Sequence, residues 1–226
     1  MEKKNTILLT VIAVATLLVA VVGATFAYFT ATSGATGNGG STGALNTATV
    51  ASVGLTAANG GSSTNTVYPG TMNYAGMTVT PTKSGEDDNN YTMTYTVNGS
   101  VTLGSEFKAG SVYYTVYRTT SAVTTPVNCQ AVAANPAADG TQYSQTCTLA
   151  SELTSGAEIV EERTAVSGTS APIAIEGETL TTESGTVYYY YLVVEYENKA
   201  TDQNVDRGKT ITASLSNVSI TNTAKA

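Results

Sequence analysis

The chain contains no histidine and no tryptophan among its 226 residues, and only 12% of its residues are charged. Without histidine, a zinc site of the H-E-x-x-H kind and serine-histidine-aspartate hydrolysis are both excluded. The charged fraction is about half of what soluble domains usually carry, so threonine, serine, asparagine and glycine must cover the surface. This composition is typical of extracellular β proteins, adhesins and fibre subunits. We therefore expect a structural or binding role, with no enzymatic activity and no cofactor.

The chain is also poor in positive charge, with 10 basic against 17 acidic residues and a formal net charge of −7. Nucleic acids and anionic lipid surfaces attract proteins with the opposite balance. We therefore expect neither of them as a partner.

The N-terminal segment is the most informative part of the sequence. A charged segment, residues 2–4, precedes an uncharged apolar run over residues 7–29. A charged start, a long apolar run and a small-x-small step make the layout of a secretory signal. Thr25 and Ala27 are small enough for the pocket of an export signal peptidase, which places the expected cut between Ala27 and Tyr28. The remaining chain is then expected to be secreted or held at the cell surface.

Two other interpretations of the same run stay open. About 20 apolar residues suffice to span a bilayer, so residues 7–29 can form an uncleaved anchor with Lys3 and Lys4 left in the cytoplasm. Alternatively, the helix can pack with its copies in the core of a pilus-like filament. Contact with a membrane is expected only through residues 1–29, and only if they are not removed.

The chain divides into three segments. Residues 1–27 form the signal peptide or N-terminal hydrophobic helix. Residues 28–45 are rich in threonine, serine, glycine and alanine and predict a flexible leader. That leader is also a candidate donor strand, because cleavage would place Tyr28 and Phe29 at its free end, where they could fill a pocket of a neighbouring subunit. The length of residues 46–226 predicts one β-sandwich domain.

Short segments rich in β-branched and aromatic residues recur from residue 49 onward, separated by glycine, asparagine, aspartate and serine clusters. We expect strands at residues 49–55, 72–80, 91–97, 111–118, 187–196 and 209–220. Turns are expected at residues 67–70, 84–90, 98–99 and 202–208. Beyond the first helix, the only helical candidate covers residues 150–162. Many short strands joined by turns predict an all-β fold, a β-sandwich of jelly-roll type.

Three of the expected strands carry further information. Residues 91–97 alternate, with Tyr91, Met93, Tyr95 and Val97 on one face, which predicts a half-buried strand. Residues 187–196 are apolar on both faces, which predicts a central strand covered on both sides. In the last strand the apolar phase slips between Leu215 and Val218, which predicts a bulge near Asn217.

Cys129 and Cys147 are the only cysteines. In an exported chain an even count favours one disulfide, which would close the loop-like residues 130–146. In the chain-entropy model a loop of this size contributes about 3 kcal/mol. Two free thiols are the alternative.

Calcium is the one metal for which the sequence contains a candidate loop. Asp202, Asn204 and Asp206 have the alternating oxygen spacing of a calcium loop. Gly208 is displaced from the glycine position of such loops, however, and the twelfth position is Ala213 rather than glutamate. A plain hairpin turn is therefore the favoured interpretation, and we assign no metal site.

Three other clusters have ordinary explanations. Residues 86–88 (Glu-Asp-Asp) and 161–162 (Glu-Glu) are expected to be solvated. Tyr188 to Tyr191 are expected to serve core and cross-strand packing rather than sugar stacking, because alternate residues of a strand face opposite sides.

Several motifs resemble one family. Residues 23–29 (Gly-Ala-Thr-Phe-Ala-Tyr-Phe) are similar to the cleavage region of Gram-positive proteins processed by the SipW-type signal peptidase, the TasA and camelysin family. Further similarities are Pro69-Gly70-Thr71, the Asn-Gly-Ser end of residues 91–100, residues 191–198 (Tyr-Leu-Val-Val-Glu-Tyr-Glu-Asn), residues 202–204 and residues 208–210. The similarity touches both ends and the first third of the chain, whereas residues 129–175 have no counterpart.

This resemblance implies a jelly-roll domain and, for TasA, polymerisation into biofilm matrix fibres. The camelysin branch is described as a metalloprotease, and the lack of histidine argues against that activity here. We expect an extracellular structural protein that polymerises with itself through its N-terminal segment into a cell-surface or biofilm-matrix filament. The alternative is a membrane-anchored or pilin-like surface adhesin that retains the N-terminal helix.

The first testable prediction concerns processing. The exported protein is expected to begin at Tyr28, because Thr25 and Ala27 satisfy the small-residue requirement of signal peptidase. N-terminal sequencing and intact mass of the exported protein measure this directly. A chain that still begins at Met1 or Glu2 would contradict cleavage and support the anchor or the filament-core helix.

Overall fold

The computed structural model describes residues 40–41, 52–58, 62–84, 88–107, 112–134, 143–199, 201–206 and 208–226. The helix expected over residues 1–27 and the residues assigned to cleavage and assembly, Thr25, Ala27, Tyr28 and Phe29, lie outside this part of the chain.

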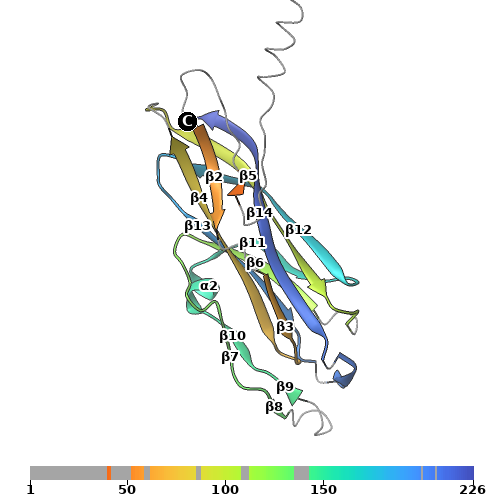
Figure 1. Ribbon diagram of the computed structural model, residues 1–226. Helices are drawn as coiled ribbons and strands as arrows, with labels where there is room; N and C mark the ends of the chain where they lie inside the picture. Colours follow the sequence, from red (N-terminus) through yellow and green to blue (C-terminus); the bar gives the residue numbers. More distant parts are fainter. Residues whose placement is uncertain are drawn as a thin grey trace, which may run out of the picture.

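Two antiparallel sheets face each other across a common core, as the all-β prediction requires (Figure 1). The six-stranded sheet, here sheet A, contains in spatial order β1 (Gly40–Ser41), β2 (Ser52–Ala58), β4 (Met72–Ser84), β13 (Tyr188–Tyr196), β6 (Val112–Thr119) and β11 (Glu158–Ala165). The four-stranded sheet, here sheet B, contains β12 (Ser170–Thr181), β5 (Tyr91–Leu103), β14 (Thr210–Lys225) and β3 (Ser62–Thr66). A short 3-10 helix, η1 (Asn204–Asp206), precedes β14.

The segment between β6 and β11, residues 120–157, is here called the insertion. It contains two small ribbons and one short helix, namely β7 (Val127–Cys129) with β10 (Cys147–Leu149), β8 (Ala133–Ala134) with β9 (Tyr143–Ser144), and α2 (Ser151–Ser155). In Figure 1 the ribbons extend along sheet A toward the end of the molecule opposite the C-terminus.

The core follows from strand alternation. Tyr91, Met93, Tyr95 and Val97 of β5 are buried and the threonines between them are half-buried, so the predicted half-buried strand is confirmed. They pack against the inward side chains of sheet A, which include Ala75, Met77, Val79, Val112, Val116, Leu192 and Val194. Each fully buried aliphatic side chain of this kind contributes about 1.5–3 kcal/mol.

Strand β13 is buried on both faces, as predicted, but its two covers differ. Its inward residues, Tyr190, Leu192, Val194 and Tyr196, belong to the main core. Tyr191 and Val193 point the other way and form a second cluster with Val123 and Leu153 of the insertion. The outer layer is therefore the insertion rather than another sheet.

The bulge predicted near Asn217 is confirmed. The register between β14 and β5 shifts between Leu215 and Asn217, and it shifts again between Ile220 and Asn222. At the first shift the Ser216 hydroxyl donates to the Asn98 carbonyl at 3.2 Å. At the second, the Thr221 hydroxyl donates to the Thr94 carbonyl at 3.1 Å. Hydroxyl side chains thus supply donors where the bulges interrupt the backbone ladder.

The turn expected at Asn98-Gly99 is wrong, because β5 runs through both residues. Gly99 lies opposite Leu215 of β14 and Ile173 of β12. A Cβ on Gly99 would lie 2.5 Å from the Ser214 carbonyl oxygen. Glycine is needed here for close approach of two strands and not for a turn.

The helix expected over residues 150–162 is also largely wrong. Only Ser151–Ser155 is helical, and Glu158–Ala165 forms β11 at the edge of sheet A. Pairing with β6 outweighs the weak helical propensity of this segment. The strand expected over residues 49–55 is observed as Ser52–Ala58, and the one over 72–80 continues to Ser84.

The crowding at Gly99 gives a stability prediction. Gly99→Ala is expected to lower the free energy of unfolding by about 1–3 kcal/mol, since the new methyl group overlaps the β14 backbone. Gly76→Ala is the matched control, because a Cβ there meets only ordinary contacts with Tyr191 and the Tyr190 carbonyl, the nearest at 3.6 Å. Urea denaturation of both variants measures the difference, and equal midpoints would contradict the prediction.

Candidate functional site

The predicted disulfide is present. Cys129 of β7 lies directly opposite Cys147 of β10, with their Cα atoms 4.0 Å apart, and the two sulfurs are bonded. The backbone N–H of Met72 points to the Cys147 sulfur at 3.3 Å. The disulfide therefore closes the insertion at the place where it contacts the start of β4.

A second contact holds the insertion to the turn at Pro69-Gly70, which the sequence predicted. The Gln145 N–H donates to the Pro69 carbonyl at 2.8 Å, and the Thr71 hydroxyl donates to the Gln145 side chain at 2.9 Å. Gly70 has a φ of +87°, and a Cβ there would lie 2.0 Å from the Gln145 carbonyl oxygen. Only glycine allows this approach.

The segment weighed as a calcium loop is a turn whose main acid points inward. Asp206 is 1% exposed and accepts a hydrogen bond from Tyr196 at 2.8 Å. Lys209 forms an ion pair with it at 2.7 Å, and the Asn204 N–H donates to Asp202 at 2.8 Å. Within the described residues, no group of three or more cysteine or acidic side chains is placed to hold a metal ion.

A charged cluster joins the two sheets between β11 and β12. Arg118 of β6 forms ion pairs with Glu158 of β11 and with Glu178 of β12. Its guanidinium also lies over the Tyr188 ring, 4.5 Å from the ring centre. The Glu178 side chain is only 11% exposed, and its ion pair with Arg118 offsets part of the cost of removing it from water.

Two buried tyrosines extend this cluster into the core. The Tyr190 hydroxyl donates to Glu178 at 2.5 Å and lies 2.7 Å from the Tyr95 hydroxyl. Because Tyr190 has one hydroxyl hydrogen and gives it to Glu178, Tyr95 must be the donor to Tyr190. Burial opposes the charge of Arg118, but Glu158 and Glu178 raise the pKa of its guanidinium, so it stays charged.

The sandwich edge formed by β11 and β12, here called the closed side, resists pairing with another strand. β11 has two register irregularities and carries Glu158, Glu161, Glu162 and Arg163. β12 contains Pro172 and an irregularity between Ile175 and Glu178. Charges, proline and bulges are the features that prevent edge-to-edge association of sheets. Of the two glutamates expected to be solvated, Glu162 is exposed, whereas Glu161 is half-buried.

The opposite edge, formed by β1, β2, β3 and β14 and here called the open side, lacks the proline and most of the charges of the closed side, although β14 has two register shifts of its own. β3 pairs with β14 only over Thr210 to Ser214. Among the described residues no strand pairs with the outer edge of residues 215–225, whose only charge is Lys225. β1, which belongs to the leader, pairs with β2 through Gly40 and Ser41, the two leader residues that the structure describes, and it also lies against β14.

No family model, no curated protein and no solved structure matches this chain. Within the described residues, no helix has the length and apolar character needed to cross a membrane.

Sequence reasoning missed the cluster of Arg118, Glu178, Tyr190 and Tyr95, because its members come from four strands. One signal was present: Glu178 stands two residues before Leu180, in a strand whose Ile173 and Ile175 alternate as core residues. An acid in such a pattern marks either a bulge or a buried ion pair, and here both occur.

The buried tyrosines give a pH prediction. Burial raises the pKa of Tyr95, Tyr190 and Tyr196 above the ordinary value of 10.0, with further increases from Glu178 for Tyr190 and from Asp206 for Tyr196. Their protons are kept in the folded state and lost from the unfolded state above about pH 10, so stability is full below that pH and falls above it. Each such proton contributes a slope of about 1.4 kcal/mol per pH unit.

Urea denaturation between pH 9 and pH 12 measures this slope, which should approach about 4 kcal/mol per pH unit toward pH 12 for these three groups. In Tyr196→Phe the slope should decrease by about 1.4 kcal/mol per pH unit, which is the contribution of one proton. An unchanged slope in that variant, or flat stability across the range, would contradict the assignment.

Proposed function

We propose that this chain is an extracellular structural protein, the subunit of a cell-surface or biofilm-matrix filament that assembles with itself through its N-terminal segment. One observation carries the proposal: one side of the sandwich has features that oppose pairing with an added strand, and the other side has few of them. The closed side carries Pro172 and several charged residues, whereas the outer edge of residues 215–225 on the open side has Lys225 as its only charge, although β14 also has two register shifts there. A sheet edge with few charges and no proline is a template for an added strand.

The leader is the strand that we assign to this edge. Gly40 and Ser41 pair with β2 of their own chain and lie against β14. The same residues, with those that precede them, can make equivalent contacts with the open side of the next subunit. Such a head-to-tail contact does not close on itself and therefore builds a fibre.

We further infer that the sandwich is a jelly roll. The eight main strands from β3 to β14 are numbered here in chain order, without the short strands of the insertion. In spatial order from β3, sheet B then contains strands one, eight, three and six. The four strands of sheet A from β4 to β11 are strands two, seven, four and five. Only the link from β6 to β11 stays within one sheet. This order supports the double Greek-key arrangement that defines jelly rolls.

Export and processing belong to the same proposal. The layout of residues 2–29 supports a secretory signal, and disulfides such as Cys129–Cys147 form in oxidising compartments. Removal of the signal would free Tyr28 and Phe29 for assembly. The resemblance to the TasA family supports the same function. We assign no catalytic role, since the buried acids Asp206 and Glu178 are both engaged by cations and tyrosines.

The central test is a cross-linking experiment based on the register of β1. Gly40 lies opposite Thr56 of β2, so cysteines at these positions are within disulfide distance. Gly40→Cys and Thr56→Cys are made as separate variants of the mature chain, mixed, allowed to polymerise and oxidised. We expect a covalent dimer between the two variants, because strand exchange brings position 40 of one subunit to position 56 of the next.

The control pairs Gly40→Cys with Ser170→Cys on the closed side, where no cross-link is expected. A second experiment removes residues 28–43 and images the protein by electron microscopy. Filaments that form equally well without the leader, or filaments that form without any covalent dimer between the two variants, would refute assembly by strand exchange. A protein that stays monomeric under all conditions would instead favour the membrane-anchored adhesin.

A further inference from the structure

Exposed hydrophobic side chains gather at the end of the molecule where the insertion meets η1. The described residues expose four large hydrophobic side chains, and three of them, Val132, Tyr143 and Val205, belong to the insertion or to η1. Their exposed fractions are 39%, 47% and 65%, whereas the fourth, Ile159 of β11, is 49% exposed. Single exposed apolar side chains are ordinary, but a group of them marks a surface for contact with another molecule.

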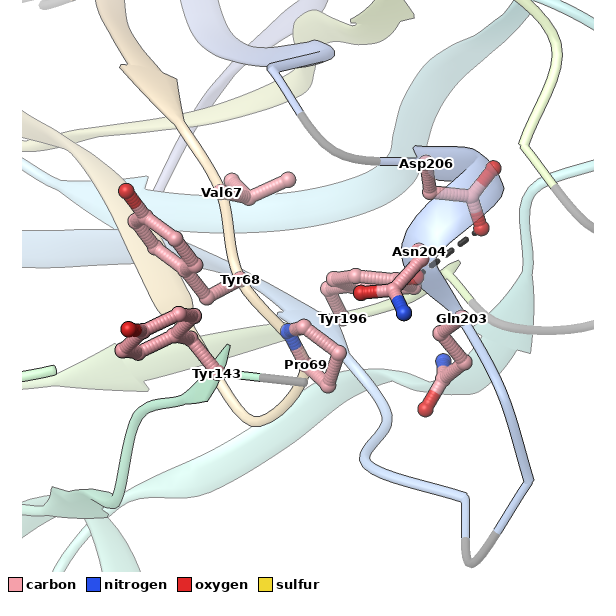
Figure 2. A pocket seen from close by; sticks show the side chains of 8 residues that line it. All are labelled: Val67, Tyr68, Pro69, Tyr143, Tyr196, Gln203, Asn204 and Asp206. Atoms are coloured by element: carbon pink, nitrogen blue, oxygen red, sulfur yellow. Dashed lines mark hydrogen bonds between the residues drawn. The ribbon is translucent and has the colours of Figure 1, made fainter. Parts of the chain in front are cut away.

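The backbone brings the three side chains to one place. Tyr143 of β9 pairs with β8, and Val132 directly precedes β8. Tyr143 also borders a small, narrow pocket together with Asn204 and Asp206, which are the two neighbours of Val205 in η1 (Figure 2). The patch formed by Val132, Tyr143 and Val205 is here called the apolar end.

The ribbons that carry most of this patch have no charge. From Thr119 to Ala134 and from Tyr143 to Ser151 the chain contains no acidic or basic residue. The whole chain has a formal charge of −7, so two copies repel each other wherever their acids meet. An uncharged ribbon can approach another copy without this repulsion, and its apolar surface gains about 25 cal/mol for each Å² removed from water.

The patch is held in a fixed position within one subunit. The disulfide between Cys129 and Cys147 joins β7 to β10, and the Gln145 N–H donates to the Pro69 carbonyl at 2.8 Å. On the side of η1, Gln203 is 2% exposed and bonds the backbone of the preceding turn. A surface that is ordered in advance avoids the cost of ordering its side chains and loops on binding.

Residues 42–51, which join β1 to β2, limit the distance between neighbouring subunits of the proposed fibre. When β1 is exchanged, this link bridges two subunits, and a chain of its length spans at most about 40 Å. The link begins and finishes near the same end of the sandwich, because Ser41 is opposite Leu55 and Ser52 is opposite Ser84. Equivalent ends of neighbouring subunits therefore lie within roughly 40 Å of each other.

The molecule is longer than this limit. β4 has 13 residues and covers about 40 Å by itself, and the insertion continues past the start of β4 (Figure 1). Neighbouring subunits of the same orientation therefore overlap along part of their length, and the apolar end of one subunit lies beside the next.

We propose that the apolar end is buried against a second copy of this chain in the fibre, as a contact separate from strand exchange. The inference rests on the proposed function, because the overlap of neighbouring subunits is what brings a second copy to this surface. Burial of Val132, Tyr143 and Val205 then adds to the contacts that the exchanged strand makes.

The first test measures whether the apolar end becomes inaccessible on assembly. Val205→Cys and the matched control Ile159→Cys each add one free thiol at an exposed position, since Cys129 and Cys147 are bonded to each other. Both variants of the mature chain are labelled with a maleimide as monomers and as filaments. Because thiol reactivity depends on exposure, labelling of Val205→Cys is expected to slow by about ten-fold or more in filaments. Labelling of Ile159→Cys should stay nearly unchanged.

The second test places a charge in the patch. Tyr143→Asp and Val205→Asp are expected to raise the protein concentration needed for filament formation by about ten-fold or more, since the contact would then bury a carboxylate without a partner. Ile159→Asp is the control and should polymerise as the original chain does. Thermal unfolding of the monomers followed by circular dichroism is expected to be nearly the same for all three variants, because each position is exposed.

This contact and the proposed function fail in different ways. Filaments in which Val205→Cys reacts as fast as in the monomer would overturn the contact at the apolar end, even where positions 40 and 56 cross-link. Equal slowing of Val205→Cys and Ile159→Cys would also overturn it. Filaments that protect Val205→Cys but lack the cross-link would refute strand exchange and support the contact, and a chain that forms no filaments would overturn both.

Discussion

The burial of β13 on both faces is the constraint on which most of this structure depends. Its inward side chains are covered by sheet B, but Tyr191 and Val193 need a cover of their own. The insertion supplies it with Val123 and Leu153, and the Val123 N–H donates to the Tyr191 hydroxyl at 2.7 Å.

A segment as small as the insertion cannot build a self-sufficient core. The disulfide, the Gln145 contacts at Pro69 and the packing on β13 hold it together instead. Because these attachments lie along β13 and the start of β4, the insertion reaches the end of the sandwich. There Tyr143 of the insertion and Tyr68 of the turn before β4 line the same small pocket. The requirement to cover one strand thus also creates the pocket.

The distribution of charge follows a similar logic. Glu178 is almost buried, and its charge is tolerated because Arg118 and Tyr190 satisfy it. Breaking this cluster would leave an uncompensated charge between the sheets, so the edges of β11 and β12 are held together. Charge is therefore concentrated where another strand must be kept out, and it is nearly absent from the free edge of β14.

Local patterns were sufficient to predict the strands with a clear period, as at residues 91–97, and the phase slip that marks the bulge at Ser216. They failed where a local signal has two physical uses. The Asn98-Gly99 pair is a common turn signal, but here Gly99 allows two neighbouring strands to approach closely. Residues 150–162 have weak helical propensity, but the part from Glu158 onward pairs with β6 as strand β11. The disulfide was predictable from the cysteine count and the expected compartment. The open and closed sides were not, since they depend on strand order, and Arg118 meets Glu178 across 60 residues of sequence.

Strand exchange has an energetic cost, and this cost explains why the edge available on the open side must be longer than the two-residue strand β1. Within one chain, β1 is connected to β2 by a short segment and so competes at an effective concentration in the millimolar range. A strand from another subunit pays the full translational cost of association and must recover it through additional contacts. Within the part of the chain that the structure describes, β1 offers two paired residues, whereas no strand pairs with the outer edge of β14 from residue 215 to residue 225. Exchange is therefore favoured only for a leader long enough to use that edge, and a leader limited to Gly40 and Ser41 would remain in its own chain.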